Sequence, residues 1–299
     1  MRVVLFFLVA LTAYPLIAKP GTLLIVGGAL SPDNAAIYRA FIDAANGGTI
    51  AVIPSASGEP QASLDAFAAN LVQHGVARAR VIDVHLAEVD DPATTVDEAT
   101  WAANAKDSDE IATIENASAI WFTGGDQART LRLLTENGKD TPMLTAIRKR
   151  LAAGAVVGGT SAGAAIMGTG MIVCGDPRRA NDAISNDPAD CAARGGQREP
   201  LVLGGGLGFL SGYVVDQHFS QRRRLPRLLR AVACGAGRGI GIDEDTALVI
   251  DLATRRATVA GVGKVTVVER PLPRNDCATN FGMTDLGLHR SGYSFDVRQ

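Results

Sequence analysis

The sequence predicts an α/β protein with a mostly parallel central sheet and helices on both faces. Short apolar runs alternate with alanine-rich stretches whose apolar residues recur every three or four positions. Several of the apolar runs end in glycine or proline, where a chain of this class leaves a strand. Strands that alternate with helices need right-handed crossovers, and these place the strands parallel in one sheet. Functional groups then gather beyond the carboxyl ends of the strands.

The elements follow the chain in order. Strands are expected at residues 22–26, 49–53, 79–84, 119–122 and 155–157. Helices are expected over the stretches NAAIYRAFIDAAN, QASLDAFAANLVQHG, ARTLRLLTENG and TPMLTAIRKRLAAG. From about Gly239 the pattern is that of strands and hairpins. No repeat or composition shift marks a second domain, so residues 19–299 are expected to form one domain. The segments 175–200 and 265–299 remain unassigned.

Composition narrows the classes of function. The chain has 299 residues, of which 47% are hydrophobic, and its formal net charge is -2. That length supports one sizeable core, and the balanced charge argues against a nucleic-acid partner. No C-x-x-C or H-x-x-x-H spacing occurs, so we expect no metal site and no cofactor.

Residues 1–18 have the pattern of a secretory signal peptide. Arg2 precedes an unbroken apolar run from Val3 to Leu11, and Pro15 and small residues follow. The alternative is a buried first strand, but GTLLIVGGA just downstream already supplies one. The apolar run is too short for a membrane span of about 20 residues. We therefore expect a secreted or periplasmic protein with no membrane contact after the signal is removed.

Export bears on the four cysteines, because disulfides persist in oxidising compartments. Four cysteines allow three pairings. Cys174 and Cys191 bracket a polar stretch that a short bridge could fix, and Cys234 would then pair with Cys277. Four buried free thiols are the alternative.

Ser161 is the candidate nucleophile. It lies in GGTSAGAAIMG, where a short strand runs into a turn of glycines and alanines before an apolar helix. A serine on such a turn projects its hydroxyl above the sheet, and its neighbours must be small because their backbones come close. The amide of Ala162, at the helix start, is a candidate oxyanion donor. A glycine-rich packing turn without catalysis is the alternative.

A serine nucleophile needs a base and an orienting acid. Among the four histidines, His218 in YVVDQHFSQRRR follows an apolar strand and is surrounded by polar residues. Glu244 in GIGIDEDTALVI lies between two short strands and is the candidate acid. Asp243 and Asp245 are rivals on sequence grounds, and three acids in a row also suit a solvated turn.

Two further stretches predict a binding pocket. In WFTGGDQ, the amides of Gly125 and Asp126 are candidate oxyanion donors and Gln127 is a candidate substrate contact. The run RRRLPR contains the cations, which include Arg222, Arg224 and Arg227. Cations at a helix N-terminus oppose the helix dipole, which favours a role in binding carboxylates over a plain solvated face.

Four blocks, GGTSAGAAIMG, FTGGDQ, DQHFSQRRRLPRLL and GIGIDEDTALVI, resemble in this order the cyanophycinases of serine peptidase family S51. The resemblance spans residues 22–250. It implies a three-layer, flavodoxin-like fold related to class I glutamine amidotransferases, and a homodimer. It also implies a Ser161–His218–Glu244 triad. The substrate contacts it implies are Gln127, Asp216, Gln217, Arg222, Arg224 and Arg227.

The resemblance further implies an exopeptidase acting on cyanophycin. This polymer has a poly-aspartate backbone with arginine on each side-chain carboxyl, and the family releases β-Asp-Arg dipeptides through a serine acyl-enzyme. Two alternatives stay open at this point. One is an S51 dipeptidase for short aspartyl or isoaspartyl peptides, and the other is a catalytically silent binding protein on the same scaffold.

Overall fold

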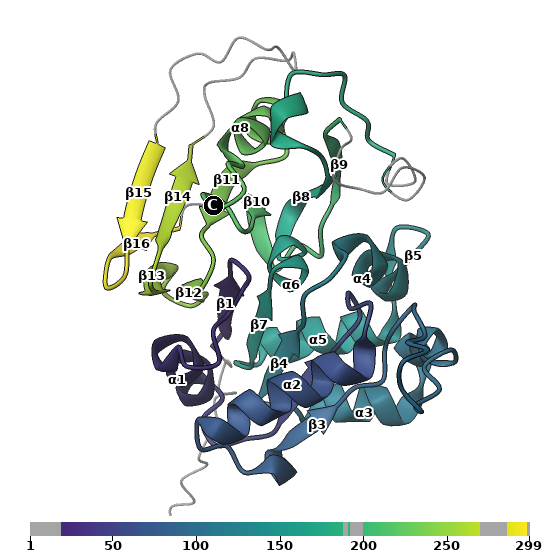
Figure 1. Cartoon of the computed structure of the whole chain (residues 1–299). Coiled ribbons are helices and arrows are strands. Elements are labelled where there is room, and N and C mark those ends of the chain that lie inside the picture. Colours follow the sequence, from purple (N-terminus) through teal and green to yellow (C-terminus); the bar gives the residue numbers. More distant parts are fainter. Residues whose placement is uncertain (1–18, 188–190, 192–199, 270–285, 298–299) are drawn as a thin grey trace, which may run out of the picture.

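Two main β-sheets form the frame of the molecule (Figure 1). The computed structural model describes residues 19–187, 191, 200–269 and 286–297. The first sheet has the strand order β16 (Ser294–Asp296), β13 (Arg256–Gly261), β12 (Thr246–Asp251), β1 (Thr22–Val26), β7 (Val156–Thr160), β4 (Ala119–Phe122), β2 (Ile50–Ile53) and β3 (Val81–Asp83). The second has the order β15 (Leu286–Arg290), β14 (Lys264–Val268), β11 (Arg238–Ile242), β10 (Leu210–Asp216), β8 (Gly168–Cys174) and β9 (Val202–Gly205). A separate ribbon consists of β5 (Thr135–Glu136) and β6 (Lys139–Asp140).

The predicted parallel sheet is confirmed in the first half of the chain. Strands β1, β7, β4, β2 and β3 are neighbours, and each pair runs parallel. The register aligns Val26 of β1 with Thr160 of β7, and Phe122 of β4 with Gly159. The residues that follow these three strands therefore meet at one edge of the sheet, where Ser161 lies.

Helices cover both faces of this sheet, as expected. They are α1 (Ala35–Ala44), α2 (Pro60–Gln73), α3 (Ser108–Asn116), α4 (Gln127–Leu134), α5 (Pro142–Ala152) and α6 (Ala162–Ala165), whereas α8 (Leu225–Ala233) belongs to the second sheet. Successive side chains of a strand point to opposite faces. In β1, Leu24 packs in a cluster with α1 and α2, whereas Leu23 packs in a cluster with α3, α4 and α5. Strands β1, β7, β4 and β2 are thus buried on both sides, and the flavodoxin-like three-layer class is confirmed.

The second sheet is an addition to the single central sheet that the sequence predicted. Strands β8, β10 and β11 run parallel to one another, while β9, β14 and β15 are antiparallel to their neighbours. Helix α8 packs on this sheet through Leu228 and Val232. The opposite face of the second sheet packs in the same apolar cluster as α3, α4 and α5, so the two sheets share an interior. The unassigned tail supplies edge strands, with β15 beside β14 and β16 beside β13.

The predicted bridge between Cys174 and Cys191 is confirmed as a disulfide. Cys277, the predicted partner of Cys234, lies outside the described residues, and so does the predicted signal peptide. Within the described ranges, no helix has the length and apolar character needed to cross a bilayer. In the same ranges, His, Cys, Asp and Glu side chains form no group that could ligate a metal ion.

Candidate active site

Ser161 lies on a sharp turn between β7 and α6. Its backbone angles are φ 54° and ψ -111°, a left-handed region that residues with a Cβ rarely adopt. The flanking glycines leave no room for a side chain. A Cβ on Gly159 would lie 2.6 Å from the carbonyl oxygen of Gly163. A Cβ on Gly163 would lie 2.4 Å from the carbonyl oxygen of Phe122. The turn therefore holds the hydroxyl above the sheet edge at the expense of backbone strain.

His218 and Glu244 complete a hydrogen-bonded chain with this serine. The Oγ atom of Ser161 is 2.8 Å from Nε2 of His218, and Nδ1 of His218 is 2.6 Å from Oε1 of Glu244. His218 lies two residues after Asp216, the last residue of β10. Its backbone N–H donates to the carbonyl of Gly27 at 2.6 Å. The amide of Ser161 donates to the carbonyl of Val26 at 3.0 Å. The end of β1 thus holds both reacting residues in place.

The three consecutive acids have distinct partners. The carboxylate of Asp243 accepts hydrogen bonds from the backbone amides of Ser220 and Lys264. The carboxylate of Asp245 accepts from the amide of Ser31 and from the side chain of Asn34. Both aspartates therefore fasten loops, and Glu244 alone of the three contacts the histidine.

The surroundings of His218 favour its neutral form. Burial lowers the pKa of His218 below its ordinary value of 6.5, and the positive charges of Arg222 and Arg224 lower it further. The hydrogen bond with Glu244 acts in the opposite direction and raises the pKa, but the net shift is downward. A neutral imidazole accepts a proton, so this environment suits a general base that acts near neutral pH.

Two backbone amides remain available for an oxyanion. Within the described residues, neither Gly125 nor Ala162 donates its N–H to another group. Gly124 packs beside the nucleophile, since a Cβ placed on it would be 3.4 Å from Cβ of Ser161. The expectation for Asp126 is wrong, because its amide already donates to the carbonyl of Ala56 at 2.8 Å. Its side chain instead accepts from the amide of Ala128 and caps α4.

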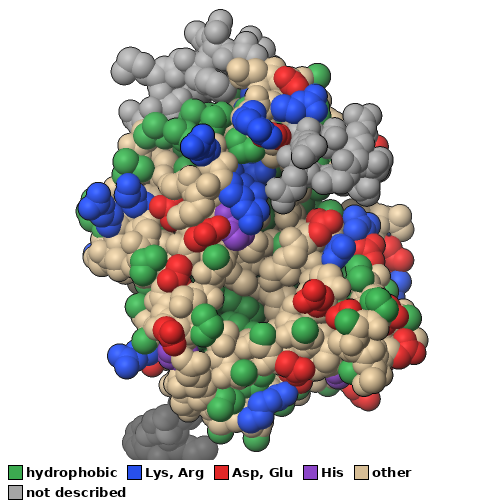
Figure 2. All heavy atoms as spheres, in the orientation of Figure 1, with side chains coloured by type: hydrophobic (Ala, Val, Ile, Leu, Met, Phe, Trp, Pro, Cys, Tyr) green, Lys and Arg blue, Asp and Glu red, His purple; other side chains and the backbone are tan. Residues whose placement is uncertain are grey.

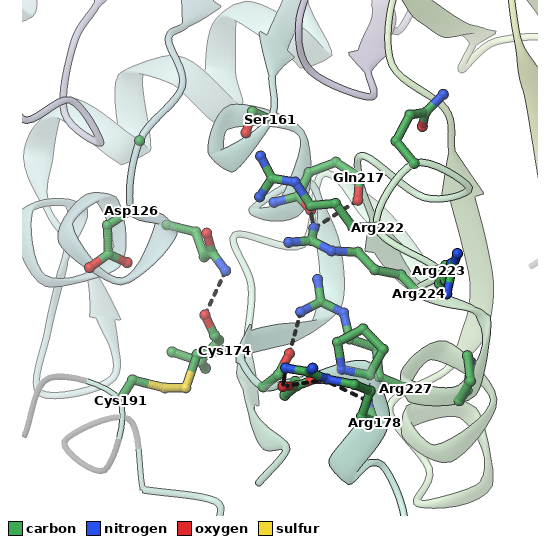
Figure 3. Close-up of a pocket in the computed structure, with 18 residues that line it drawn as sticks. Asp126, Ser161, Cys174, Arg178, Cys191, Gln217, Arg222, Arg223, Arg224 and Arg227 are labelled. Atoms are coloured by element: carbon green, nitrogen blue, oxygen red, sulfur yellow. Dashed lines mark hydrogen bonds and ion pairs between the residues drawn. A yellow bond between two sulfur atoms is a disulfide. The ribbon is translucent and has the colours of Figure 1, made fainter. Parts of the chain in front are cut away.

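A cavity of about 880 Å³ opens beside Ser161. Figure 3 shows Asp126 on one side of it and Arg222 on the other. Arg222 and Arg223 are exposed, and their guanidinium groups form no ion pair or hydrogen bond within the described part of the chain. Figure 2 shows arginine or lysine side chains gathered beside a histidine on this face. The cavity therefore offers free cations and a carboxylate within reach of a nucleophile.

Some of the expected substrate contacts have internal partners instead. Asp216 is 1% exposed and does not line the cavity, which corrects the expectation that it binds substrate. Its two oxygens accept from Nε and Nη2 of Arg227 at 2.7 and 2.5 Å. Arg224 contacts Asp216 and both the carbonyl and the side-chain oxygen of Gln217. Burial, followed by the charge of Arg227, lowers the pKa of Arg224 to about 9, so it stays cationic at neutral pH.

Gln217, Arg224 and Arg227 still reach the cavity wall, and so does Gln127. The side-chain amide of Gln127 donates to the carbonyls of Ile172 and Val173, at 3.0 and 2.6 Å. Gln127 therefore joins α4 to the second sheet as well as lining the cavity.

Two residues at the site were not predicted from the sequence. A Cβ on Gly28 would lie 2.3 Å from Cε1 of His218, so the backbone of this glycine packs directly against the imidazole. Gln221 lines the cavity, and its Oε1 accepts the backbone amide of Glu244 at 3.1 Å. The double glycine that ends β1 was visible in the sequence, but its contact with His218 joins residues 190 positions apart. Such a contact leaves no local pattern.

Comparisons with known proteins identify the family of this chain. Residues 23–256 match Peptidase family S51. Cyanophycinase of Synechococcus elongatus is 34% identical over 279 residues, which cover 92% of this chain and 75% of the relative. Cyanophycinase of Geminocystis herdmanii is 35% identical over 253 residues, which cover 83% and 80%.

Solved structures show the same fold. A peptidase from an acI-B1 actinobacterium has a TM-score of 0.64 at 18% identity, over 94% of this chain and 98% of that one. A putative peptidase E protein of Listeria monocytogenes EGD-e has a TM-score of 0.52 at 17% identity, over 82% and 100%. At these identities the likeness speaks for the fold alone. The family match, the long curated alignments and the chain of Ser161, His218 and Glu244 together lead to one conclusion: the protein belongs to the serine-type peptidases of family S51.

Proposed function

We propose that the protein is an exopeptidase that hydrolyses cyanophycin to β-Asp-Arg dipeptides. The observation that carries the proposal is the hydrogen-bonded chain from Ser161 through His218 to Glu244 at the edge of a cationic cavity. The relatives named cyanophycinase, which align over most of the chain, support the choice of substrate.

The proposed mechanism uses these residues in two half-reactions. His218 Nε2 accepts the proton of the Ser161 hydroxyl as Oγ attacks the scissile carbonyl carbon, and Glu244 stabilises the imidazolium. The amides of Gly125 and Ala162 stabilise the oxyanion of the tetrahedral intermediate. The histidine then protonates the leaving amine, and the C–N bond breaks to leave an acyl-enzyme. Water, deprotonated by the same histidine, attacks the ester and releases the second product.

The charges on the cavity wall match the polymer. Each repeat presents a free carboxylate and a guanidinium, so a site needs both cations and an anion. Arg222 and Arg223 carry no carboxylate partner within the described residues and are available to the substrate carboxylate. Asp126 is available to the substrate guanidinium, since its carboxylate lines the cavity and carries no arginine partner in the described chain.

The test is incubation of the protein with insoluble cyanophycin granules, followed by clearing of the suspension and mass analysis of the products. We expect clearing with β-Asp-Arg as the main product. Ser161→Ala should lower kcat at least about 10⁴-fold, because losing a nucleophile removes the covalent route. The variant should stay folded, as its circular dichroism will show. Turnover by Ser161→Ala at the wild-type rate would contradict the serine mechanism. Cleavage of short isoaspartyl peptides with intact granules would favour the dipeptidase.

Export and dimerisation complete the proposal. Residues 1–18 have the composition of a signal peptide, and a disulfide between Cys174 and Cys191 suits an oxidising compartment. We expect a bacterial host to release a chain shortened by about 18 residues, and intact mass will give its start. Family resemblance supports a homodimer, and light scattering that yields the mass of one chain would contradict it.

A further inference from the structure

The segment after β8 carries an ion pair at the edge of the cavity. Asp176 is 6% exposed, and its oxygens accept from the backbone amide of Arg178 at 2.9 Å and from its guanidinium at 2.6 to 3.1 Å. These hydrogen bonds lower the pKa of Asp176 below its ordinary value. The carboxylate therefore stays ionised and holds the arginine side chain in one orientation.

Two links fasten this ion pair to the rest of the site. The guanidinium of Arg227 donates through Nη1 to the carbonyl of Gly175 at 2.7 Å, so the helix wall holds the residue just before Asp176. The Cys174–Cys191 disulfide joins the end of β8 to the far side of the same segment, and both cysteines line the cavity. The ion pair thus belongs to the cavity wall rather than to a loose loop.

One edge of the Arg178 guanidinium is open. Its Nε and Nη2 atoms contact Asp176, whereas Nη1 has no hydrogen-bond partner among the described residues. The side chain is 84% exposed and lines the cavity. Figure 3 places Arg178 at the end of the cavity away from Ser161, with Arg227 between them. A planar guanidinium with a free edge is suited to bind a carboxylate through two parallel hydrogen bonds.

We propose that Arg178 forms a second carboxylate subsite, which binds a repeat of the substrate beyond the pair joined by the scissile bond. This inference rests on the proposed function, because a chain of repeats, each with a free carboxylate, is what would reach both Ser161 and Arg178. The subsite makes the enzyme prefer long chains over short ones. It is a contact of binding and leaves the chemistry at Ser161 unchanged.

The experiment compares substrates of two lengths. One contains two β-Asp-Arg repeats, with a single bond to cleave, and the other is soluble cyanophycin of many repeats. For Arg178→Ala we expect KM on the long substrate to rise about tenfold, the order for one lost charge-assisted contact. Values of kcat on both substrates, and KM on the two-repeat substrate, should stay within about twofold of wild type.

A matched control lies next in the chain. Arg179 is also exposed and pairs with Asp182 at 2.7 Å, but it does not line the cavity. Arg179→Ala should therefore leave KM on both substrates unchanged. An Arg178→Ala protein that loses activity equally on both lengths would assign the residue to folding and overturn the subsite. A KM on the long substrate equal to that of Arg179→Ala would overturn it as well.

A binding measurement separates this inference from the proposed function. Ser161→Ala and the double variant Ser161→Ala/Arg178→Ala are titrated calorimetrically with an uncleaved oligomer of four β-Asp-Arg repeats. If the wild type cleaves neither substrate, the proposed activity fails while the titration still decides the subsite. Binding weakened about tenfold in the double variant supports the subsite, since the lost contact acts on affinity alone. Equal affinities overturn it.

Discussion

The triad depends on which of its neighbouring residues are small and on which of the nearby acids already have partners. The sequence predicted Ser161, His218 and Glu244 from the ends of strands, because parallel strands bring such ends together. The residue pattern alone kept Asp243 and Asp245 as rivals of Glu244, and the family resemblance selected Glu244, since the partners that engage the two aspartates come from distant loops. The error at Asp126 has the same origin, because the Ala56 carbonyl that takes its amide lies far away in the chain.

The pH dependence follows from the shift of His218. Its pKa lies below 6.5, so the imidazole is neutral, and active as a base, at every pH above that lowered value. The acidic limb of the kcat/KM profile should therefore have a midpoint below pH 6.5. Arg222→Gln removes a positive charge that lowers this pKa, so the limb should move to higher pH. A profile of Arg222→Gln that moves to lower pH, or not at all, would contradict the assignment.

Gly28 tests the contact with the imidazole. Gly28→Ala places a methyl group 2.3 Å from Cε1 of His218, so the imidazole must move away. Displacing the base by about 1 Å should lower kcat on the order of 100-fold. Gly47→Ala is the control, since Gly47 also has a positive φ, +76° against +99°, but has open space around it. Both variants carry backbone strain, so equal kcat values in the two would contradict a steric role for Gly28.

At the scale of elements, α8 and the end of β10 are joined by a buried ion pair that the sequence presented as a binding motif. The spacing of DQHFSQRRRLPR showed that charged residues gather there, but not that Arg227 turns inward to Asp216. An arginine that binds substrate and one that binds a buried aspartate have the same appearance in a sequence. Burial separates them here, because Arg222 is exposed whereas Arg227 is 5% exposed.

Removing the buried charge should destabilise the fold. Asp216→Asn leaves Arg227 and Arg224 without their anion, and breaking such a pair costs about 3 kcal/mol or more in the free energy of unfolding. Asp182→Asn breaks the exposed pair with Arg179 and should change it by less than about 1 kcal/mol. Urea unfolding monitored by circular dichroism gives both values. Equal stability of Asp216→Asn and Asp182→Asn would mean that the buried pair has no structural role.

At the scale of the whole molecule, two sheets share one interior and leave a cationic cavity at their junction. The parallel half was predicted well because continuous apolar strands and amphipathic helices alternate there in order. The second sheet was not predicted, since its strand order β10-β8-β9 follows from long-range pairing rather than from local pattern. The edge strands β15 and β16 in the tail were not predicted either. Their local pattern is too weak to assign, and they form by pairing with β14 and β13.

The disulfide closes part of this cavity, and its loss should be measurable. Cys174 and Cys191 are 17 positions apart, and cross-linking a loop of about that length contributes roughly 3 kcal/mol by restricting the unfolded chain. The double variant Cys174→Ser/Cys191→Ser should unfold at correspondingly lower urea under non-reducing conditions. An unchanged urea midpoint would show that the disulfide does not stabilise the fold by restricting the unfolded chain.

The left-handed turn at Ser161 sets thermal stability against catalytic activity. A non-glycine residue held in that region costs on the order of 1–3 kcal/mol, so Ser161→Gly should melt at a higher temperature than the active enzyme while cleaving nothing. Directed evolution that selects for heat resistance alone would thus favour early replacement of Ser161 and loss of activity. A screen for a more thermostable enzyme must therefore measure turnover in every round.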